Sequence, residues 1–483
     1  MASLKGATIR SLFWKLFEQG GTAVVTLVVQ IVLARLLAPE QFGMLAIMLV
    51  FINVGNVIVQ SGLNTAIIQA PDATEKDYST VFWMSLAISL VLYVAVFLFA
   101  PVVADFYTMP EAVTPLRVLT LVLVVNAYNS IQEAIVAREM QFQKTFRATI
   151  SAGVCSGTVG ILMAVFGCGI WALVAQQLVQ QAVKCLVLAL QVPWKPRFEF
   201  ETHRAKVLFR FGWKLLVSGL LEQGYQGLSS LLIGKAFNKT DLGYVDQGKK
   251  YPYALGCLLD GAIQPVMLSA VAKVSDDAAM VKRLARRALK TSTFLVMPAM
   301  ALFAAAAEPI VRLLLGEQWL PSVPFLQMYC FVYALLPIHT TNLQVLNGVG
   351  RSDVFLKLEV IKKVVGVSIL LVACFVFQNL YVLVASYILT AIISTFINAW
   401  PNKKIIGYSY VEQLRDIAPA FALALVCAAC VYPLVLLGLP DIATICLQVV
   451  AMVVLYCVAA KLFRVEAFSY LLNTLKQIRM KSL

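Results

Sequence analysis

The sequence predicts an all-α polytopic membrane protein with 14 transmembrane helices. Three observations predict this class: 60% of the 483 residues are hydrophobic, only 13% are charged, and the mean hydropathy is +0.83. A soluble domain is about 45–50% apolar and about 25% charged, and its core cannot hide this much apolar side chain. The same composition excludes intrinsic disorder and a disulfide scaffold. The apolar runs are continuous rather than alternating, which excludes a transmembrane β-barrel.

Fourteen apolar stretches are long enough to cross the hydrocarbon as helices, which requires about 20 residues. The first stretch is too long for the apolar region of a signal peptide and has no small-residue cleavage site after it, so we expect an uncleaved anchor. The expected spans are 11–36, 42–68, 79–104, 114–137, 146–167, 169–191, 210–236, 243–272, 288–307, 322–346, 354–376, 379–400, 415–438 and 441–463.

The basic residues predict the orientation of these spans. With a cytoplasmic amino terminus, the cytoplasmic segments carry 27 lysines and arginines and the external loops carry 5. This distribution follows the positive-inside bias, so we expect both termini in the cytoplasm. Orientation then explains most of the net charge of +14, and nucleic acid is not expected as a partner. The basic runs at 195–210 and 282–290 are expected to be amphipathic connectors on an anionic leaflet.

Short matches about 200 residues apart indicate an internal repeat. Trp14-Lys15-Leu16 matches Trp213-Lys214-Leu215, and PEQFG ending at Gly43 matches KTDLG ending at Gly243. Six spans separate the matched segments, so both copies enter the membrane in the same direction, as in a parallel repeat. The predicted organisation is an N-lobe over 1–191, a cytoplasmic linker over 192–209, a C-lobe over 210–400, and two further helices with a cytoplasmic tail over 401–483.

Polar side chains gather on the first two spans of each predicted half. Charged groups at membrane depth are costly and normally face a cavity or a partner, and the four amides of the second span recur at the three- and four-residue spacing of one helical face. The candidates for a hydrophilic substrate cavity are Lys249, Lys250, Asn53, Asn56, Gln60, Asn64, Tyr225, Gln226, Lys15 and Lys214. The candidates for ion coupling are Glu18, Glu222, Asp246 and Asp260.

Structural roles compete with these functional ones. The amides also suit interhelical hydrogen bonds, Lys15 is also able to snorkel to the headgroups, and a single histidine such as His339 usually serves packing or hydrogen bonding. The ten cysteines lie in or beside apolar runs, and Cys427-x-x-Cys430 has no nearby histidine, so we expect packing residues rather than a metal site. No cofactor is expected.

Several motifs resemble the Wzx-type polysaccharide transporters of the multidrug/oligosaccharidyl-lipid/polysaccharide exporter superfamily, in particular their colanic-acid and teichuronic-acid branch. They include LARLLAPEQFGMLAI (33–47), LGYVDQGKKYPYAL (242–255) and LLLGEQWLPSVPFLQM (313–328). The resemblance covers about residues 5–463. It implies a V-shaped fold of two lobes that flips undecaprenyl-pyrophosphate-linked sugars to the outer leaflet, with Lys249 and Lys250 at a position where relatives often carry a cation. Asp246 departs from that pattern, and the basic residues that lipid II flippases use on helices 1 and 2 are absent.

The leading hypothesis is therefore a flippase of the bacterial inner membrane that exports lipid-linked oligosaccharide by alternating access. No nucleotide-binding P-loop is present, so an ion gradient is the expected energy source. Membrane lipids, a polysaccharide polymerase and glycosyltransferases are the expected partners. The alternatives are a drug/cation antiporter, which needs an acidic chamber, and a membrane polysaccharide polymerase, which usually needs a large external loop. No catalytic constellation appears, so an enzyme is not expected.

Overall fold

The computed structural model describes residues 20–69, 74–261 and 263–481, and the regular secondary structure in these ranges is helical. The chain divides into two compact units, Met1–Gly243 and Tyr244–Leu483. The helix that the sequence assigns to the start of a C-lobe at residue 210 belongs to the first unit. The lobe limits read from the repeat stay a prediction.

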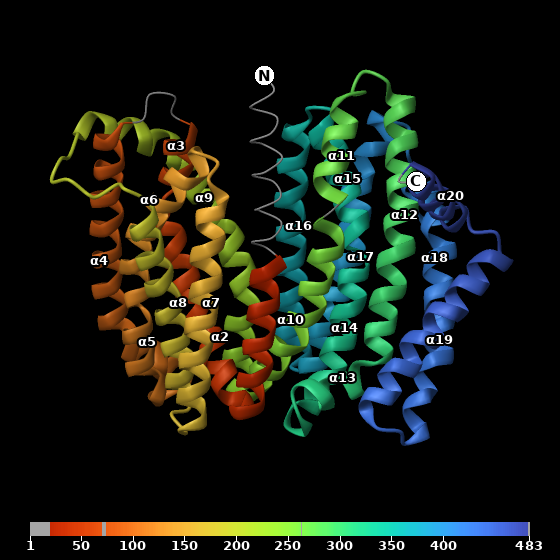
Figure 1. Ribbon diagram of the computed structural model, residues 1–483, viewed down its shortest axis with the longest axis horizontal. Helices are drawn as coiled ribbons and strands as arrows, with labels where there is room; N and C mark the ends of the chain where they lie inside the picture. Colours follow the sequence, from red (N-terminus) through yellow and green to blue (C-terminus); the bar gives the residue numbers. More distant parts are fainter. Residues whose placement is uncertain (1–19, 70–73, 262, 482–483) are drawn as a thin grey trace. The chain divides into compact units, whose positions relative to one another are not determined.

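The first unit contains long helices, most of them joined by short turns (Figure 1). α10 begins in this unit and continues into the second. The elements are a helix over Gly20–Leu36, α2 (Pro39–Gln60), α3 (Leu63–Gln69), α4 (Glu75–Phe106), η1 (Pro110–Ala112), α5 (Val113–Leu119), α6 (Leu121–Arg138), α7 (Phe142–Val165), α8 (Ile170–Gln191), α9 (Thr202–Ala236) and α10 (Lys239–Gly261).

The second unit is also built from long helices, several of them interrupted by short turns or irregular helical segments. Its elements after α10 are α11 (Ile263–Ala272), α12 (Ala278–Ala305), α13 (Ala307–Leu314), η2 (Glu317–Ser322), α14 (Val323–Ala334), α15 (Leu336–Gly348), α16 (Ser352–Val372), η3 (Ala373–Phe377), α17 (Leu380–Ile405), α18 (Tyr410–Val431), η4 (Tyr432–Leu437), α19 (Asp441–Leu462) and α20 (Glu466–Lys481).

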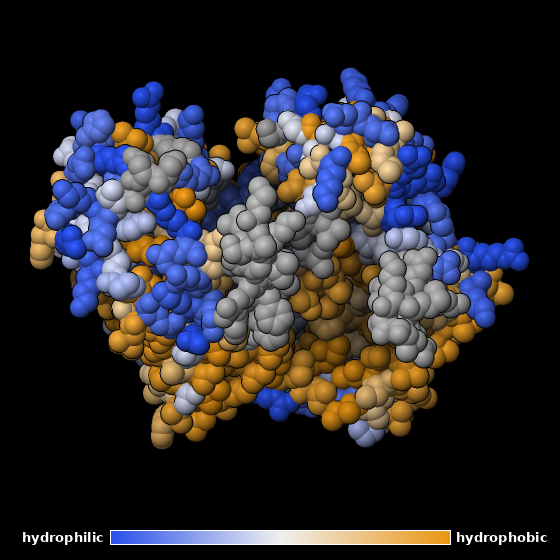
Figure 2. Space-filling model, turned by 45° about the horizontal axis from the view of Figure 1, so that its top comes forward, coloured by the Kyte–Doolittle hydropathy of each residue, from blue (hydrophilic) through white to orange (hydrophobic). Residues whose placement is uncertain are grey.

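Eleven helical segments within the described ranges are long and apolar enough to cross a membrane, which establishes a multi-pass membrane protein. Three of the fourteen expected spans are not among them. The first is described only from Gly20 onward, and its described part, Gly20–Leu36, is a shorter apolar helix. The other two correspond to α9 and α10, whose charged side chains lower their mean hydropathy. The expected span 243–272 is also divided between α10 and α11. In each unit, hydrophilic residues gather at one end of the helices and hydrophobic residues cover the flanks (Figure 2).

Four glycines of α9 allow it to pack closely against α2 and against the turn that follows α2. They recur every seven or eight residues, at 212, 219, 227 and 234, so they share one helical face. A Cβ at Gly219 would lie 2.9 Å from the Val57 side chain, and one at Gly227 would lie 2.5 Å from Val50. Packing of this kind allows backbones to approach where lipid provides no hydrophobic drive between helices.

The connection from α8 to α9 is not an amphipathic connector over its whole length. Residues 192–201 are irregular and are fixed to α4, because Arg197 N–H donates to Ser79 Oγ (3.2 Å) and Glu201 N–H donates to Thr80 Oγ1 (3.1 Å). Trp194 is buried in an aromatic cluster with Phe82 and other rings. The second basic run, 282–290, lies inside the continuous helix α12, so it is not a separate connector either.

Candidate functional site

The lysine pair predicted for the cavity lies on one side of α10. Lys249 and Lys250 are half-buried, and Asp246 and Tyr253 share their helical face at three- and four-residue spacing. The carboxylate of Asp246 interacts electrostatically with both ammonium groups. The face therefore carries a net positive charge, which suits contact with an anionic group.

α10 packs closely against α14. A Cβ at Gly248 would lie 2.9 Å from Phe325 Cβ, and one at Gly256 would lie 3.2 Å from Tyr333 Cβ. Gln247 and Tyr251 of α10 are also buried. The glycines therefore hold α10 close to α14.

Aromatic rings adjoin the lysine-bearing helix. Tyr253 meets Tyr333 edge to face, with ring centroids 5.5 Å apart. Tyr333 stacks on Tyr329 at 6.2 Å, and Tyr329 lies 5.9 Å from Tyr387 of α17. Tyrosines combine an apolar ring with a hydroxyl, the combination that suits contact with sugars at an apolar wall.

Asp260 lies at the carboxyl end of α10 and is 1% exposed. It accepts hydrogen bonds from Thr340 Oγ1 of α15 and from Gln264 Nε2 of α11, the latter at 3.4 Å. Its Oδ1 is buried with no hydrogen-bond partner among the described residues. Fourteen residues, about 21 Å of helix, separate it from Asp246, so the two acidic candidates on α10 do not form one site.

The four amides of the second predicted span do not share one continuous helix. α2 ends at Gln60, where Ser61 adopts a left-handed conformation and Gly62 has φ +68°, and Asn64 lies in α3. Asn53 and Gln60 are exposed. Asn56 accepts a 2.8 Å hydrogen bond from Asn126 of α6, the interhelical role that such amides also serve.

The candidates on α9 are only partly brought together. Gln226 Nε2 donates to Glu222 Oε1 at 2.7 Å, one helical turn apart, and Tyr225 is half-buried beside them. Lys214 is exposed two turns earlier. Lys15 and Glu18 lie outside the described residues.

Sequence reasoning did not single out an ion pair between two helices of the first unit. Lys184 of α8 pairs with Glu133 of α6, and their side chains are 22% and 38% exposed. Opposite charges within apolar helices are normally partners, so the two charged residues in apolar spans were the signal available in the sequence.

A buried amide network in the second unit was also not predicted. Asn342 Oδ1 accepts hydrogen bonds from Asn402 at 2.6 Å and from Gln413 at 2.9 Å. Nearby in the sequence, His339 Nδ1 lies 3.1 Å from Asn398 Nδ2.

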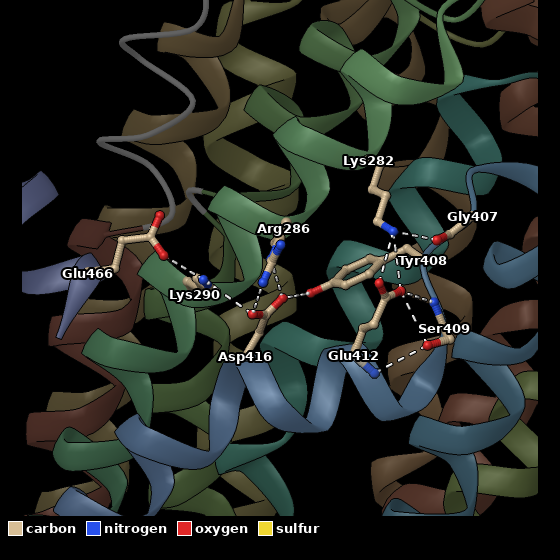
Figure 3. Close-up of polar contacts among 9 residues, drawn as sticks. All are labelled: Lys282, Arg286, Lys290, Gly407, Tyr408, Ser409, Glu412, Asp416 and Glu466. Carbon is tan, nitrogen blue, oxygen red and sulfur yellow. Dashed lines mark hydrogen bonds and ion pairs between the residues drawn. The ribbon is translucent and has the colours of Figure 1, made fainter.

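An ion-pair cluster joins α12 to α18 and α20 (Figure 3). Arg286 binds Asp416 through two hydrogen bonds of 2.6 and 2.8 Å, and Lys290 bridges Asp416 (3.2 Å) and Glu466 (2.6 Å). Burial and the hydrogen bond to Asp416 raise the pKa of Tyr408 far above its ordinary value. The cluster therefore fixes α18 and α20 to α12.

No group of three or more possible metal ligands occurs within the described ranges. The ten cysteines form no disulfide there, and the Cys-x-x-Cys has one buried and one exposed member. The candidate functional features are the lysine-bearing face of α10, the tyrosines beside it and the buried carboxyl of Asp260.

A sequence model of a family described as "Polysaccharide biosynthesis protein" matches residues 32–324. The chain belongs to this polysaccharide biosynthesis family. Among curated family relatives, it is 26% identical to the succinoglycan biosynthesis transport protein ExoT of Rhizobium meliloti, over 71% of this chain and 70% of that protein. It is 24% identical to the lipopolysaccharide biosynthesis protein WzxC of Escherichia coli, over 88% and 86%.

Solved structures place the fold of this polysaccharide biosynthesis protein among transporters. The lipid II flippase MurJ in an inward closed conformation has a TM-score of 0.75 at 12% identity and covers 94% of this chain and 98% of its own. An inward-facing multidrug resistance transporter of the MATE family has a TM-score of 0.60 at 16% identity, covering 80% of this chain and 95% of its own. Both likenesses concern the fold alone.

Proposed function

We propose that the chain moves oligosaccharide repeat units, linked to undecaprenyl pyrophosphate, across the bacterial cytoplasmic membrane by alternating access. Its family membership and the named transport role of ExoT support this activity. In this proposal the chain is a transporter rather than an enzyme and crosses the membrane 14 times with both termini in the cytoplasm. Two six-helix lobes, over 1–191 and 210–400, move against each other, and a polysaccharide polymerase and glycosyltransferases act on the same substrate.

The observation that carries the proposal is the lysine-bearing face of α10. A diphosphate is strongly hydrated and cannot enter hydrocarbon without polar partners. Lys249 makes no hydrogen bond or ion pair with another described residue, so its three N–H donors are available to a ligand. In the proposed mechanism Lys249 and Lys250 hold the pyrophosphate, the exposed Tyr253 contacts the sugars, and the polyprenyl tail stays in lipid.

The test replaces both lysines by alanine and measures flipping of a lipid-linked oligosaccharide in proteoliposomes. A matched control replaces Lys403 and Lys404, an exposed adjacent pair in the last turn of α17. We expect the first variant to lose at least tenfold in flipping rate at normal reconstitution, and the control to keep the wild-type rate. Wild-type flipping by the variant lacking Lys249 and Lys250 contradicts the cationic site.

Asp260 supports a proposed route for ion coupling. Its carboxyl is buried, and the two side chains that donate hydrogen bonds to it, Thr340 and Gln264, are neutral. In this mechanism Asp260 binds a proton in one state and releases it in the other. Glu222 is the weaker candidate because it is only half-buried and hydrogen-bonded on its own helix.

A further inference from the structure

A groove in the second unit combines cations at one end with an apolar wall. Its volume is about 550 Å³. α18 contributes one wall, and the end of α19 with the start of α20 contributes the other. We call it the α18 groove, and its principal lining residues are Arg415, Pro419, Leu423, Val426, Phe463 and Arg464.

The wall from α18 is one face of the helix, a stripe that is apolar except for Arg415 at its amino-terminal end. Arg415, Pro419, Leu423 and Val426 recur at spacings of three or four residues, so they line one face. From Arg415 to Val426 the stripe is about 16 Å long. Val426 is 60% exposed and Phe463, on the opposite wall, is 69% exposed. In a membrane protein this apolar exposure faces acyl chains.

The cations at the head of the groove are not neutralised by the protein. Arg415 and Arg464 are exposed, and neither guanidinium has a hydrogen-bond or ion-pair partner in the part of the chain that the structure describes. Arg464 follows the end of α19 in a left-handed conformation (φ 51°). The two carboxylates that also line the groove are already paired: Asp416 with Arg286 and Lys290, and Glu466 with Lys290 (Figure 3).

A second cavity of about 440 Å³ adjoins the cationic end of the α18 groove, and Lys290 and Glu466 line both. It adds two more arginines of α12 without a carboxylate partner among the described residues. Arg283 contacts the sulfur of Met280, and Arg287 lies over the ring of Tyr470 at 4.4 Å. The basic side chains around these two cavities therefore outnumber the carboxylates of the ion-pair cluster, and this corner of the unit carries excess positive charge.

We propose that the α18 groove binds an anionic membrane phospholipid, with the phosphate between Arg415 and Arg464 and one acyl chain along the stripe. Guanidinium groups hydrogen-bond phosphate oxygens in a bidentate manner, and the stripe offers an apolar face about 16 Å long for an acyl chain. A free phosphate would leave the apolar wall uncovered, and a zwitterionic lipid would bring its own cationic group to a corner that already carries excess positive charge. The bound lipid bridges α18 and α20 and so stabilises the attachment of the last two spans.

The test counts phosphatidylglycerol molecules retained by the full-length protein in native mass spectrometry, for the wild type and the double variant Arg415→Gln/Arg464→Gln. Each basic residue near an anionic lipid contributes about 1 kcal/mol, so we expect roughly tenfold or more weaker retention in the variant. The matched control Lys403→Gln/Lys404→Gln also removes two exposed cations and should retain lipid as the wild type does.

Two further arms separate the lipid from other occupants. Phosphatidylcholine should be retained weakly by both proteins, and inorganic phosphate should not displace phosphatidylglycerol. Leu423→Trp fills the stripe without changing charge and should weaken retention as well. Unchanged retention in the arginine variant, equal retention of phosphatidylcholine, or displacement by inorganic phosphate each overturns the proposal. Because the readout is lipid binding, its failure leaves the transport proposal untouched.

Discussion

Gly43 and Gly243, which are matched in the predicted internal repeat, contact each other where α2 and α10 begin. A Cβ on Gly43 would collide with the carbonyl oxygen of Lys239, and a Cβ on Gly243 would collide with the carbonyl oxygen of Pro39. Pro39 and Lys239 are themselves 200 residues apart, as the two glycines are. The contact is therefore reciprocal. Lys239 reinforces it with ion pairs to Glu40 (3.6 Å) and Glu111.

The first prediction concerns this glycine contact. We expect Gly43→Ala to lower the melting temperature of the purified protein and to reduce transport, because the added methyl group meets backbone that cannot rotate away. Overpacking of this kind costs about 1–3 kcal/mol. Gly224→Ala is the control, since nothing lies within 4 Å of a Cβ there, and alanine favours a helix over glycine. Equal melting temperatures for the two variants would show that the contact is absent or easily separated.

The second prediction concerns the ion pair between Asp77 and Arg204. Asp77 is 2% exposed, accepts two hydrogen bonds of 2.7 and 2.9 Å from Arg204, and caps the start of α4 through Thr74. Breaking a buried pair costs about 3–5 kcal/mol, so Asp77→Ala should lower the melting temperature strongly.

Its control is Asp353→Ala. Asp353 pairs with Arg351 in similar geometry, but both side chains are more than half exposed, and exposed pairs contribute little. The control should melt as the wild type does. A large loss for Asp353→Ala, or none for Asp77→Ala, would show that burial does not set the contribution of these pairs.

The third prediction concerns Asp260. Asp260→Asn should preserve the fold, because the amide oxygen still accepts from Thr340, and should make flipping in proteoliposomes independent of an imposed proton gradient. Asp276→Asn, an exposed residue in the turn before α12, is the control and should keep the wild-type response. If the Asp260→Asn variant responds to the gradient as the wild type does, the proton passes elsewhere.

Composition and periodicity predicted the helical membrane class because hydrophobic length is a local property of the chain. The limits of α2 were not predictable in this way: the left-handed Ser61 and Gly62 end the helix, and so Asn64 leaves the face of the other amides. The pairing of Glu133 with Lys184 was missed for another reason. The two residues are 51 positions apart, and only packing of α6 against α8 brings them together. Lys249 and Lys250 were selected from the sequence because adjacent charges are uncommon in an apolar span, and their role in a cavity stays a prediction.

The last prediction uses the Glu133–Lys184 pair to separate an ion pair's contribution from the cost of an unpaired charge. Glu133→Gln leaves the ammonium of Lys184 half-buried without its carboxylate, so this variant should melt at a clearly lower temperature than the wild type. Glu133→Gln/Lys184→Met removes both charges and keeps similar volumes, and replacement of a whole ion pair by uncharged groups is often neutral. We therefore expect the double variant to melt at a higher temperature than the single one. A double variant that is less stable than Glu133→Gln would show instead that Lys184 has a second partner worth more than its pairing with Glu133.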